Sequence, residues 1–174
     1  MTIQDDILRA DNYVITSTNI PDAMAELANF YHSLNIVEIG GDNCGPWINW
    51  LSVAQGTPWC GAFVRRVVER AFAKFGSSPN YDWTPPADPT FWIPEGVTRA
   101  KNAGLFRFSE DGYQPKAGDV MFLKSNDPNI GHSHAGIVVV GADPAEMFQS
   151  VEGNWSDKCS RVTRTILSCD FAEA

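Results

Sequence analysis

The chain has 174 residues, of which 44% are hydrophobic and 20% are charged, and its formal net charge is −8. This composition is that of a folded globular protein and excludes a disordered chain. The negative charge argues against nucleic acid or an anionic membrane surface as the main partner. The length favours a single domain over residues 1–174.

The N-terminal residues lack the basic region and the apolar run of a secretory signal, and no stretch has the roughly 18 apolar residues of a membrane helix. We expect synthesis in the cytoplasm, with exit only by a route that reads no N-terminal signal. In a reducing compartment Cys44, Cys60, Cys159 and Cys169 should be thiols. Cys159 and Cys169 flank a predicted strand and can pair only if the protein reaches an oxidising space.

The first half of the chain has helical periodicity, although residues 1–18 show no firm period. Pro21 and Pro46 each suit the first turn of a helix, and the second of these helices should end at residues 56–58. The clearest helix spans residues 60–75, with one apolar stripe and a following glycine, Gly76, suited to the left-handed conformation.

The second half predicts a sheet. Residues 78–95 hold five prolines and form a long loop, and a short helix is expected at residues 97–103. Runs of apolar and β-branched residues then predict strands at 118–123, 134–140, 147–151 and 162–167, with the 134–140 strand central because it is continuously apolar. Helices followed by strands indicate an α+β protein with helices packed on one face of an antiparallel sheet.

Cys60 lies where a loop meets the strongest helix, and a helix N-terminus stabilises a thiolate. The backbone N–H groups there can also hold the oxyanion of a tetrahedral intermediate. The alternative, a buried structural cysteine, is the one that position alone favours. A cysteine nucleophile needs a base, and of the three histidines we favour His134, which opens the central strand. His32 is interpreted as a surface or packing residue and His132 as a solvated loop residue.

The imidazole of His134 needs a polar partner that fixes its orientation and tautomer. Residues 152–154 (EGN) end the next strand, and antiparallel pairing would bring Glu152 and Asn154 beside the start of the His134 strand. An ordinary turn is the alternative for both residues.

Four segments in this order resemble the motifs of CHAP domains, the cysteine, histidine-dependent amidohydrolases/peptidases with a papain-like fold. They are residues 59–64 (WCGAFV), 116–122 (KAGDVMF), 134–138 (HAGIV) and 151–154 (VEGN), and residues 37–46 (VEIGGDNCGP) are similar to a stretch of single-domain relatives. Within that stretch, Cys44 stands where the relatives usually have another residue, and it is a second thiol at a helix start. Residues 1–30 fall outside the resemblance and can be a family-specific extension.

The resemblance implies that Cys60 is the nucleophile, that His134 is the general base, and that Glu152 or Asn154 completes the site. It implies hydrolysis of peptidoglycan, either as an N-acetylmuramoyl-L-alanine amidase or as an endopeptidase of the stem peptide or cross-link. Trp59, Trp83, Trp92 and Trp155 are candidates to line the cleft, with core packing the preferred interpretation for Trp59. Some relatives bind calcium through an acidic loop, but no Asp-rich run is present here, so no metal or cofactor is predicted.

A lone catalytic domain without a signal fits a phage or prophage endolysin, and it also fits an amidase effector injected into rival cells. Either would act as a monomer on the cell wall, in the periplasm or outside, after release or delivery. Two other classes remain as alternatives: a metal-dependent hydrolase using His132 and His134, and a non-catalytic cell-wall-binding module. The second would be expected to have lost Cys60, His134 or the residue 152–154 segment.

Overall fold

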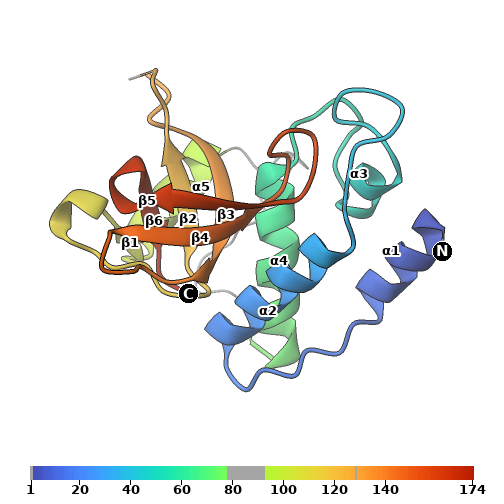
Figure 1. Cartoon of the computed structure of the whole chain (residues 1–174), viewed down its shortest axis with the longest axis horizontal. Helices are drawn as coiled ribbons and strands as arrows, with labels where there is room; N and C mark the ends of the chain where they lie inside the picture. Colours follow the sequence, from blue (N-terminus) through green and yellow to red (C-terminus); the bar gives the residue numbers. More distant parts are fainter. Residues whose placement is uncertain (1, 78–92, 128) are drawn as a thin grey trace.

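The computed structural model describes residues 2–77, 93–127 and 129–174 and is an α+β protein (Figure 1). Helices occupy the first part of the described chain and strands the second, as the hydrophobic periodicity predicts. The helices are α1 (Ile3–Asp11), α2 (Ile20–Ser33), α3 (Pro46–Trp50), α4 (Cys60–Lys74) and α5 (Ile93–Asn102). The strands are β1 (Phe106–Arg107), β2 (Val120–Lys124), β3 (His132–Val140), β4 (Met147–Glu152), β5 (Ser160–Thr165) and β6 (Cys169–Ala172), with short 3-10 turns η1 (Ser109–Asp111) and η2 (Ile166–Ser168).

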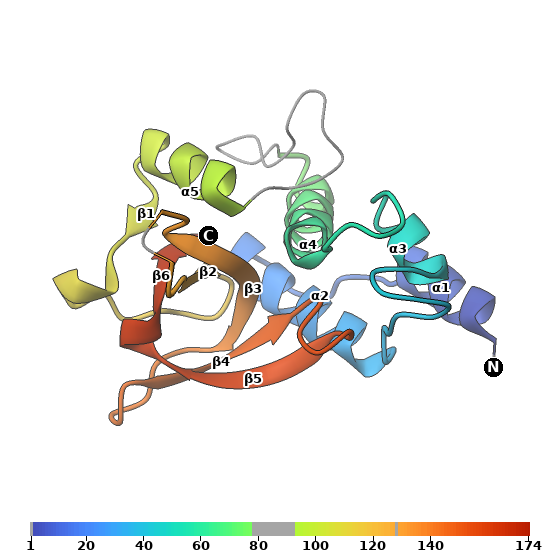
Figure 2. The ribbon, with the colours of Figure 1, turned by 90° about the horizontal axis from the view of Figure 1, so that it is seen from above.

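The described strands form one antiparallel sheet in the order β1-β6-β2-β3-β4-β5. Strand β3 is internal and residues 134–139 are buried, which confirms the prediction of a central strand. Helices α2, α4 and α5 all contact β3 (Figure 2). The larger core lies between these helices and the sheet. A smaller hydrophobic cluster contains strand residues such as Phe148 and Phe171. Apolar side chains on both faces explain why β3 is continuously hydrophobic.

Helix α4 confirms the strongest helical prediction. Its apolar stripe is buried at Val64, Val67, Val68 and Ala71, while its charged residues lie mostly off that stripe. The helix ends at Lys74, and Gly76 follows with a φ of 63°, the left-handed conformation that favours glycine. Burial of this stripe fixes the position of the helix, and therefore of Cys60 at its N-terminus.

Several boundaries differ from the sequence predictions. Residues 3–11 form α1, which begins with a capping box between Thr2 and Asp5 that periodicity alone does not reveal. Helix α3 ends at Trp50, well before residues 56–58, because Ser52 has a φ of 58° and turns the chain. Most of the predicted loop, residues 78–92, lies outside the described residues, and α5 begins at Ile93.

The strand predictions also need correction at the C-terminal end. Strand β5 covers residues 160–165 rather than 162–167, and η2 follows it. Strands β1 and β6 were not predicted, because two and four residues are too short to show an alternating pattern. Strand β6 nevertheless lies inside the sheet, between β1 and β2.

Residues 2–30 pack on the rest of the domain, through α1 against α3 and through α2 against α4 and β3. Arg70 of α4 donates to the backbone carbonyls of Ala10, Asp11 and Tyr13, where α1 ends and the chain turns towards α2. Its guanidinium also donates to the Tyr31 hydroxyl of α2, at 2.7 Å. One cation therefore satisfies carbonyl groups that the end of α1 leaves without helical partners.

We predict that Arg70→Met destabilises the protein by about 2 kcal/mol, because it leaves three carbonyl oxygens, two of them partly buried, without this donor. Chemical denaturation measures the free energy of unfolding. Arg161→Met removes the same charge from an exposed position whose contact is Asn29, and should change stability by less than about 0.5 kcal/mol. Equal stability of the parent and Arg70→Met would contradict the role of this cation.

No helix among the described residues is long and apolar enough to cross a membrane.

Candidate active site

Cys60 is the first residue of α4, where the sequence predicts it, and 8% of its surface is exposed. Trp59 is the N-cap, and the first hydrogen bond of the helix runs from Phe63 N to Trp59 O at 2.9 Å. The backbone N–H groups of residues 60–62 therefore precede the helical hydrogen-bond ladder. They surround the thiol with the positive end of the helix dipole.

His134 lies near the start of β3, is also 8% exposed, and contacts both Cys60 and Glu152. Its Nε2 atom is 3.0 Å from Glu152 Oε2. Nε2 makes no aligned hydrogen bond by strict geometry, so we describe this contact as an ion pair. Burial disfavours the charged imidazole, but the interactions with Cys60 and Glu152 outweigh burial and raise the pKa of His134 to about 9.

Glu152, the last residue of β4, has no exposed surface. Its carboxylate accepts hydrogen bonds from Arg164 Nε and Nη2, both at 2.6 Å, and from Ser150 Oγ at 2.5 Å. Burial alone would raise the pKa of Glu152, but Arg164, His134 and Ser150 together lower it. The carboxylate is therefore ionised beside the imidazole at neutral pH.

Two glycines allow these side chains to meet. A Cβ atom on Gly136 of β3 would lie 2.6 Å from Glu152 Cγ. The glycine therefore leaves the space in which the Glu152 side chain crosses β3. A Cβ atom on Gly153 would lie 2.5 Å from Phe63 Cβ, so this glycine allows the end of β4 to approach α4 closely. Both glycines belong to the segments that resemble the CHAP motifs, and packing gives each a physical reason.

Asn154 is directed away from His134. Its amide lies 2.7 Å from Asn43 Oδ1. With the amide nitrogen turned towards Glu38, Nδ2 donates to Glu38 Oε1 at 2.9 Å and Oδ1 accepts from the backbone N of Trp59 at 3.3 Å. Of the two residues that the sequence offered as partner of the imidazole, the geometry brings Glu152 to it, while Asn154 supports the N-terminus of α4.

Glu38, which lies in segment 37–46, joins the preceding loop to the cysteine helix. Its carboxylate accepts from Asn43 N at 2.5 Å and from Trp59 Nε1 at 2.9 Å. Among the described residues, the carboxylates of Glu38, Asp42 and Asp157 come within 4.8 Å of one another, a spacing suited to a cation. The contacts of Glu38 are with protein donors, so we assign this cluster a structural role.

The four candidate tryptophans have different outcomes. Trp59 is fully buried, which confirms core packing. The Trp155 ring lies 5.3 Å from that of His134, between centroids, and is partly exposed, so it borders the site. Trp83 and Trp92 lie outside the described residues.

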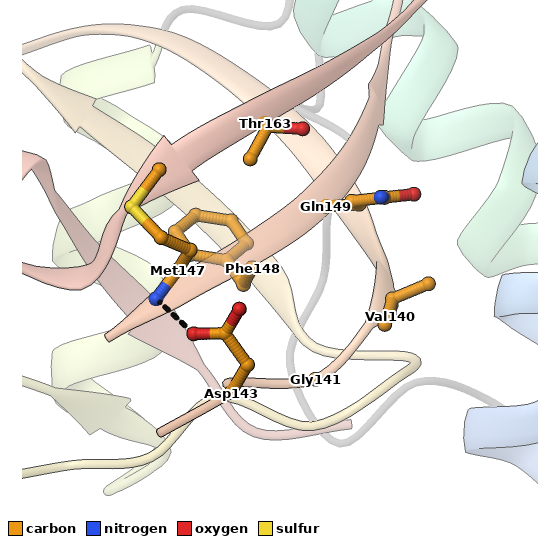
Figure 3. Close-up of a pocket in the computed structure, with 7 residues that line it drawn as sticks. All are labelled: Val140, Gly141, Asp143, Met147, Phe148, Gln149 and Thr163. Atoms are coloured by element: carbon orange, nitrogen blue, oxygen red, sulfur yellow. Dashed lines mark hydrogen bonds between the residues drawn. The ribbon is translucent and has the colours of Figure 1, made fainter. Parts of the chain in front are cut away.

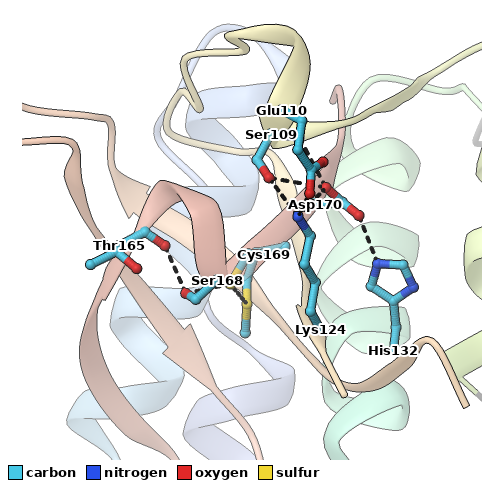
Figure 4. Close-up of polar contacts among 9 residues, drawn as sticks. Ser109, Glu110, Lys124, His132, Thr165, Ser168, Cys169 and Asp170 are labelled. Atoms are coloured by element: carbon cyan, nitrogen blue, oxygen red, sulfur yellow. Dashed lines mark hydrogen bonds and ion pairs between the residues drawn. The ribbon is translucent and has the colours of Figure 1, made fainter. Parts of the chain in front are cut away.

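The interpretation of His132 as a solvated loop residue is wrong. His132 opens β3, and its Nε2 lies 2.9 Å from Asp170 Oδ2, a buried carboxylate on the unpredicted strand β6 (Figure 4). Asp170 also accepts from the backbone N of Ser109 at 2.9 Å and lies 3.4 Å from Lys124 Nζ. His132 and His134 thus have separate carboxylate partners, which does not favour a shared metal site. His32, at the end of α2, is partly buried, as a surface or packing residue should be.

The other cysteines have surroundings unlike that of Cys60. Cys159 and Cys169 are buried free thiols, and burial raises the pKa of both, to about 11 for Cys169. Cys44, also free, is partly exposed and lies in the loop before α3. Among the described residues, the cysteine in contact with a histidine is Cys60.

A shallow pocket of about 80 Å³ lies between β3, β4 and β5 (Figure 3). Val140, Met147 and Thr163 contribute to its lining. His134 is near the start of β3 and Glu152 ends β4, whereas this pocket lies where β3 ends and β4 begins. It is therefore at the opposite end of the strands from the thiol and belongs to a different part of the surface.

Comparisons with protein-family models, characterised proteins and solved structures gave no match to this chain.

The sequence reasoning missed Arg164 and Ser150. The β4–β5 register pairs Phe148 with Arg164 and Ser150 with Val162. Because alternate residues of a strand share a face, the side chains of Ser150, Glu152 and Arg164 lie on the same face of the sheet. An arginine at an inward-facing strand position, next to a strand that ends in glutamate, indicates a buried arginine–glutamate ion pair. This pattern could not be used because the sequence alone does not fix the register between β4 and β5.

We predict that the His134 imidazole titrates near pH 9, as followed by NMR, because Cys60 and Glu152 stabilise its charged form. Cys60→Ser and Glu152→Gln should each lower the midpoint, whereas Asn154→Ala should leave it near the parent value. Because the pKa rises on folding from 6.5, the charged imidazole stabilises the fold at acidic pH, and this contribution is lost as the pH rises towards 9. A parent midpoint at or below 6.5 would contradict the assigned contacts.

Proposed function

We propose that this protein is a cysteine amide hydrolase with a papain-like CHAP fold, and that its substrate is bacterial peptidoglycan. One observation carries the chemical part of the proposal: Cys60 at a helix N-terminus contacts His134, which an ionised Glu152 contacts in turn. These residues come from three distant parts of the chain. Convergence of a nucleophile, a base and a group that orients the base is the arrangement that nucleophilic catalysis requires.

The raised pKa of His134 supports a charged imidazole at neutral pH, and an imidazolium beside a helix N-terminus is a setting that favours a reactive cysteine thiolate. In the first half of the reaction, the Cys60 thiolate attacks the amide carbonyl and forms a C–S bond. Backbone N–H groups at the start of α4 stabilise the oxyanion. The imidazolium of His134 then donates its proton to the leaving amine as the C–N bond breaks, which leaves a thioester and a neutral imidazole.

Water completes the reaction. The neutral imidazole accepts a proton from water as its oxygen attacks the thioester carbonyl. Collapse of this second tetrahedral intermediate breaks the C–S bond, releases the carboxylic acid, which loses its proton to solvent, and restores the thiolate–imidazolium pair. Glu152 keeps its negative charge throughout and orients the ring, so it acts as a positioning residue.

The substrate class rests on the four ordered segments that resemble CHAP motifs. Two residues of these segments gain support from packing, since Gly136 and Gly153 are required for Glu152 and α4 to approach the site. We propose cleavage either of the bond between muramic acid and L-alanine or of a bond within the stem peptide or cross-link. Action as a phage or prophage endolysin is the preferred setting, with delivery as an antibacterial effector the alternative.

We predict that the protein digests purified peptidoglycan and that Cys60→Ser slows digestion by about 10³-fold or more, because the serine hydroxyl lacks a stabilised anion. Mass spectrometry of the fragments identifies the bond: a new N-terminal L-alanine marks an amidase, and ends within the stem or cross-link mark an endopeptidase. Cys44→Ser serves as the matched control and should digest at the parent rate.

Digestion should be lost after iodoacetamide treatment and should persist in the presence of a chelator. The reverse pattern would favour a metal-dependent hydrolase. Digestion by Cys60→Ser at the parent rate would contradict the proposed function, as would the absence of new ends with any peptidoglycan type tested.

A further inference from the structure

Arg164 is a buried cation that the proposed reaction does not itself require. Its side chain, on β5, is 10% exposed. The guanidinium donates one hydrogen bond of 2.6 Å to each carboxylate oxygen of Glu152. Such a paired contact fixes the plane of a carboxylate as well as neutralising its charge. The geometry leaves Glu152 Oε2 directed at His134 Nε2, 3.0 Å away.

The second contact of Arg164 also leads to His134. The guanidinium carbon lies 4.2 Å from the centroid of the Trp155 ring, in a cation–π contact. The same indole packs against the His134 imidazole, with ring centroids 5.3 Å apart. Arg164 thus supports the histidine from two sides, through the carboxylate on one and the indole on the other.

Burial determines what Glu152 would do without this cation. A carboxyl group with no exposed surface favours its neutral form, and Arg164 is the largest influence that opposes burial here. A neutral Glu152 offers the imidazolium no opposite charge. Loss of Arg164 should therefore weaken the charged state of His134, although Cys60 and His134 are unchanged.

We propose that Arg164 is a positioning residue that holds Glu152 ionised and aimed at His134, and so maintains the charged imidazole beside Cys60. The titratable groups facing His134 are Cys60 from α4 and Glu152 from β4. The charge of Glu152 also acts on the thiols of Cys159 and Cys169. Burial raises the pKa of both thiols, so both stay neutral. The inference concerns the site of the proposed hydrolase, but it can be tested without a substrate.

The test is the pH dependence of Cys60 alkylation by iodoacetamide, read for each cysteine by peptide mass spectrometry. In Arg164→Met we expect Cys60 to react about tenfold more slowly at neutral pH, because a less charged His134 imidazole stabilises the reacting thiolate less. Cys44 in the same molecule is an internal reference and should react at the parent rate. Arg161→Met, on the same strand, is the matched control for loss of one charge and should keep the parent profile.

A double-mutant cycle distinguishes positioning from a general structural role. If Arg164 acts through Glu152, Arg164→Met adds little to the shift already caused by Glu152→Gln. Arg164→Lys keeps the charge but only one donor direction, so its profile should lie between those of the parent and Arg164→Met. Should Arg164→Met fail to fold, as judged by its thermal unfolding, Arg164→Gln takes its place in the same cycle.

An alkylation profile in Arg164→Met or Arg164→Gln identical to that of Arg161→Met would overturn the proposal. So would a full additional shift on top of Glu152→Gln. Because alkylation does not depend on peptidoglycan, the expected profiles without any wall digestion would reject the proposed substrate and leave the role of Arg164 supported. Normal wall digestion with an unshifted alkylation profile would support the proposed substrate and reject the role of Arg164.

Discussion

The ion pair between Arg164 and Glu152 joins two neighbouring strands at a carboxylate that has no exposed surface. A buried charge is costly unless it is paired and hydrogen-bonded, and Glu152 meets this condition with Arg164, Ser150 and His134. Removal of any of these partners leaves the remaining charges less well compensated. The protonation of His134 therefore depends on an interaction that lies on the far side of Glu152 from the imidazole.

The fold brings this carboxylate and the thiol together by close packing of small residues. Glu152 crosses β3 where Gly136 has no side chain, and Gly153 allows the end of β4 to lie against Phe63 of α4. The apolar stripe of α4 packs towards β3 and so fixes the helix N-terminus that carries Cys60. Stability and chemistry are coupled, because the burial that holds α4 in place also excludes water from the imidazole and the carboxylate.

Much of this arrangement could be predicted from the sequence because it follows from local pattern. The stripe of α4 and the continuous apolar run of β3 identified the two elements that carry Cys60 and His134. The order of strands 134–140 and 147–151 was enough to bring Glu152 beside the imidazole, since consecutive antiparallel strands place the end of one beside the start of the other.

The remainder depends on contacts between distant residues. The choice between Glu152 and Asn154 could not be made because Asn154, with a φ of 59°, turns towards Asn43 and the α4 N-terminus. Arg164 was missed because its role depends on the β4–β5 register, and His132 because its partner Asp170 lies on a strand of four residues. Helix α1 spans nine residues, a short window for detecting a helical period, and a cap at Thr2 together with Arg70 holds it.

The central claim is that the Cys60 thiol and the His134 imidazole act as one pair, with the imidazole charged at neutral pH. The ultraviolet absorbance of the thiolate, taken as the difference between the parent and Cys60→Ser across a pH titration, measures this coupling most directly. The account predicts that His134→Ala changes the pH dependence of the signal, because an imidazolium in contact with a thiol stabilises the thiolate. A signal with the same pH dependence in the parent and in His134→Ala would contradict it.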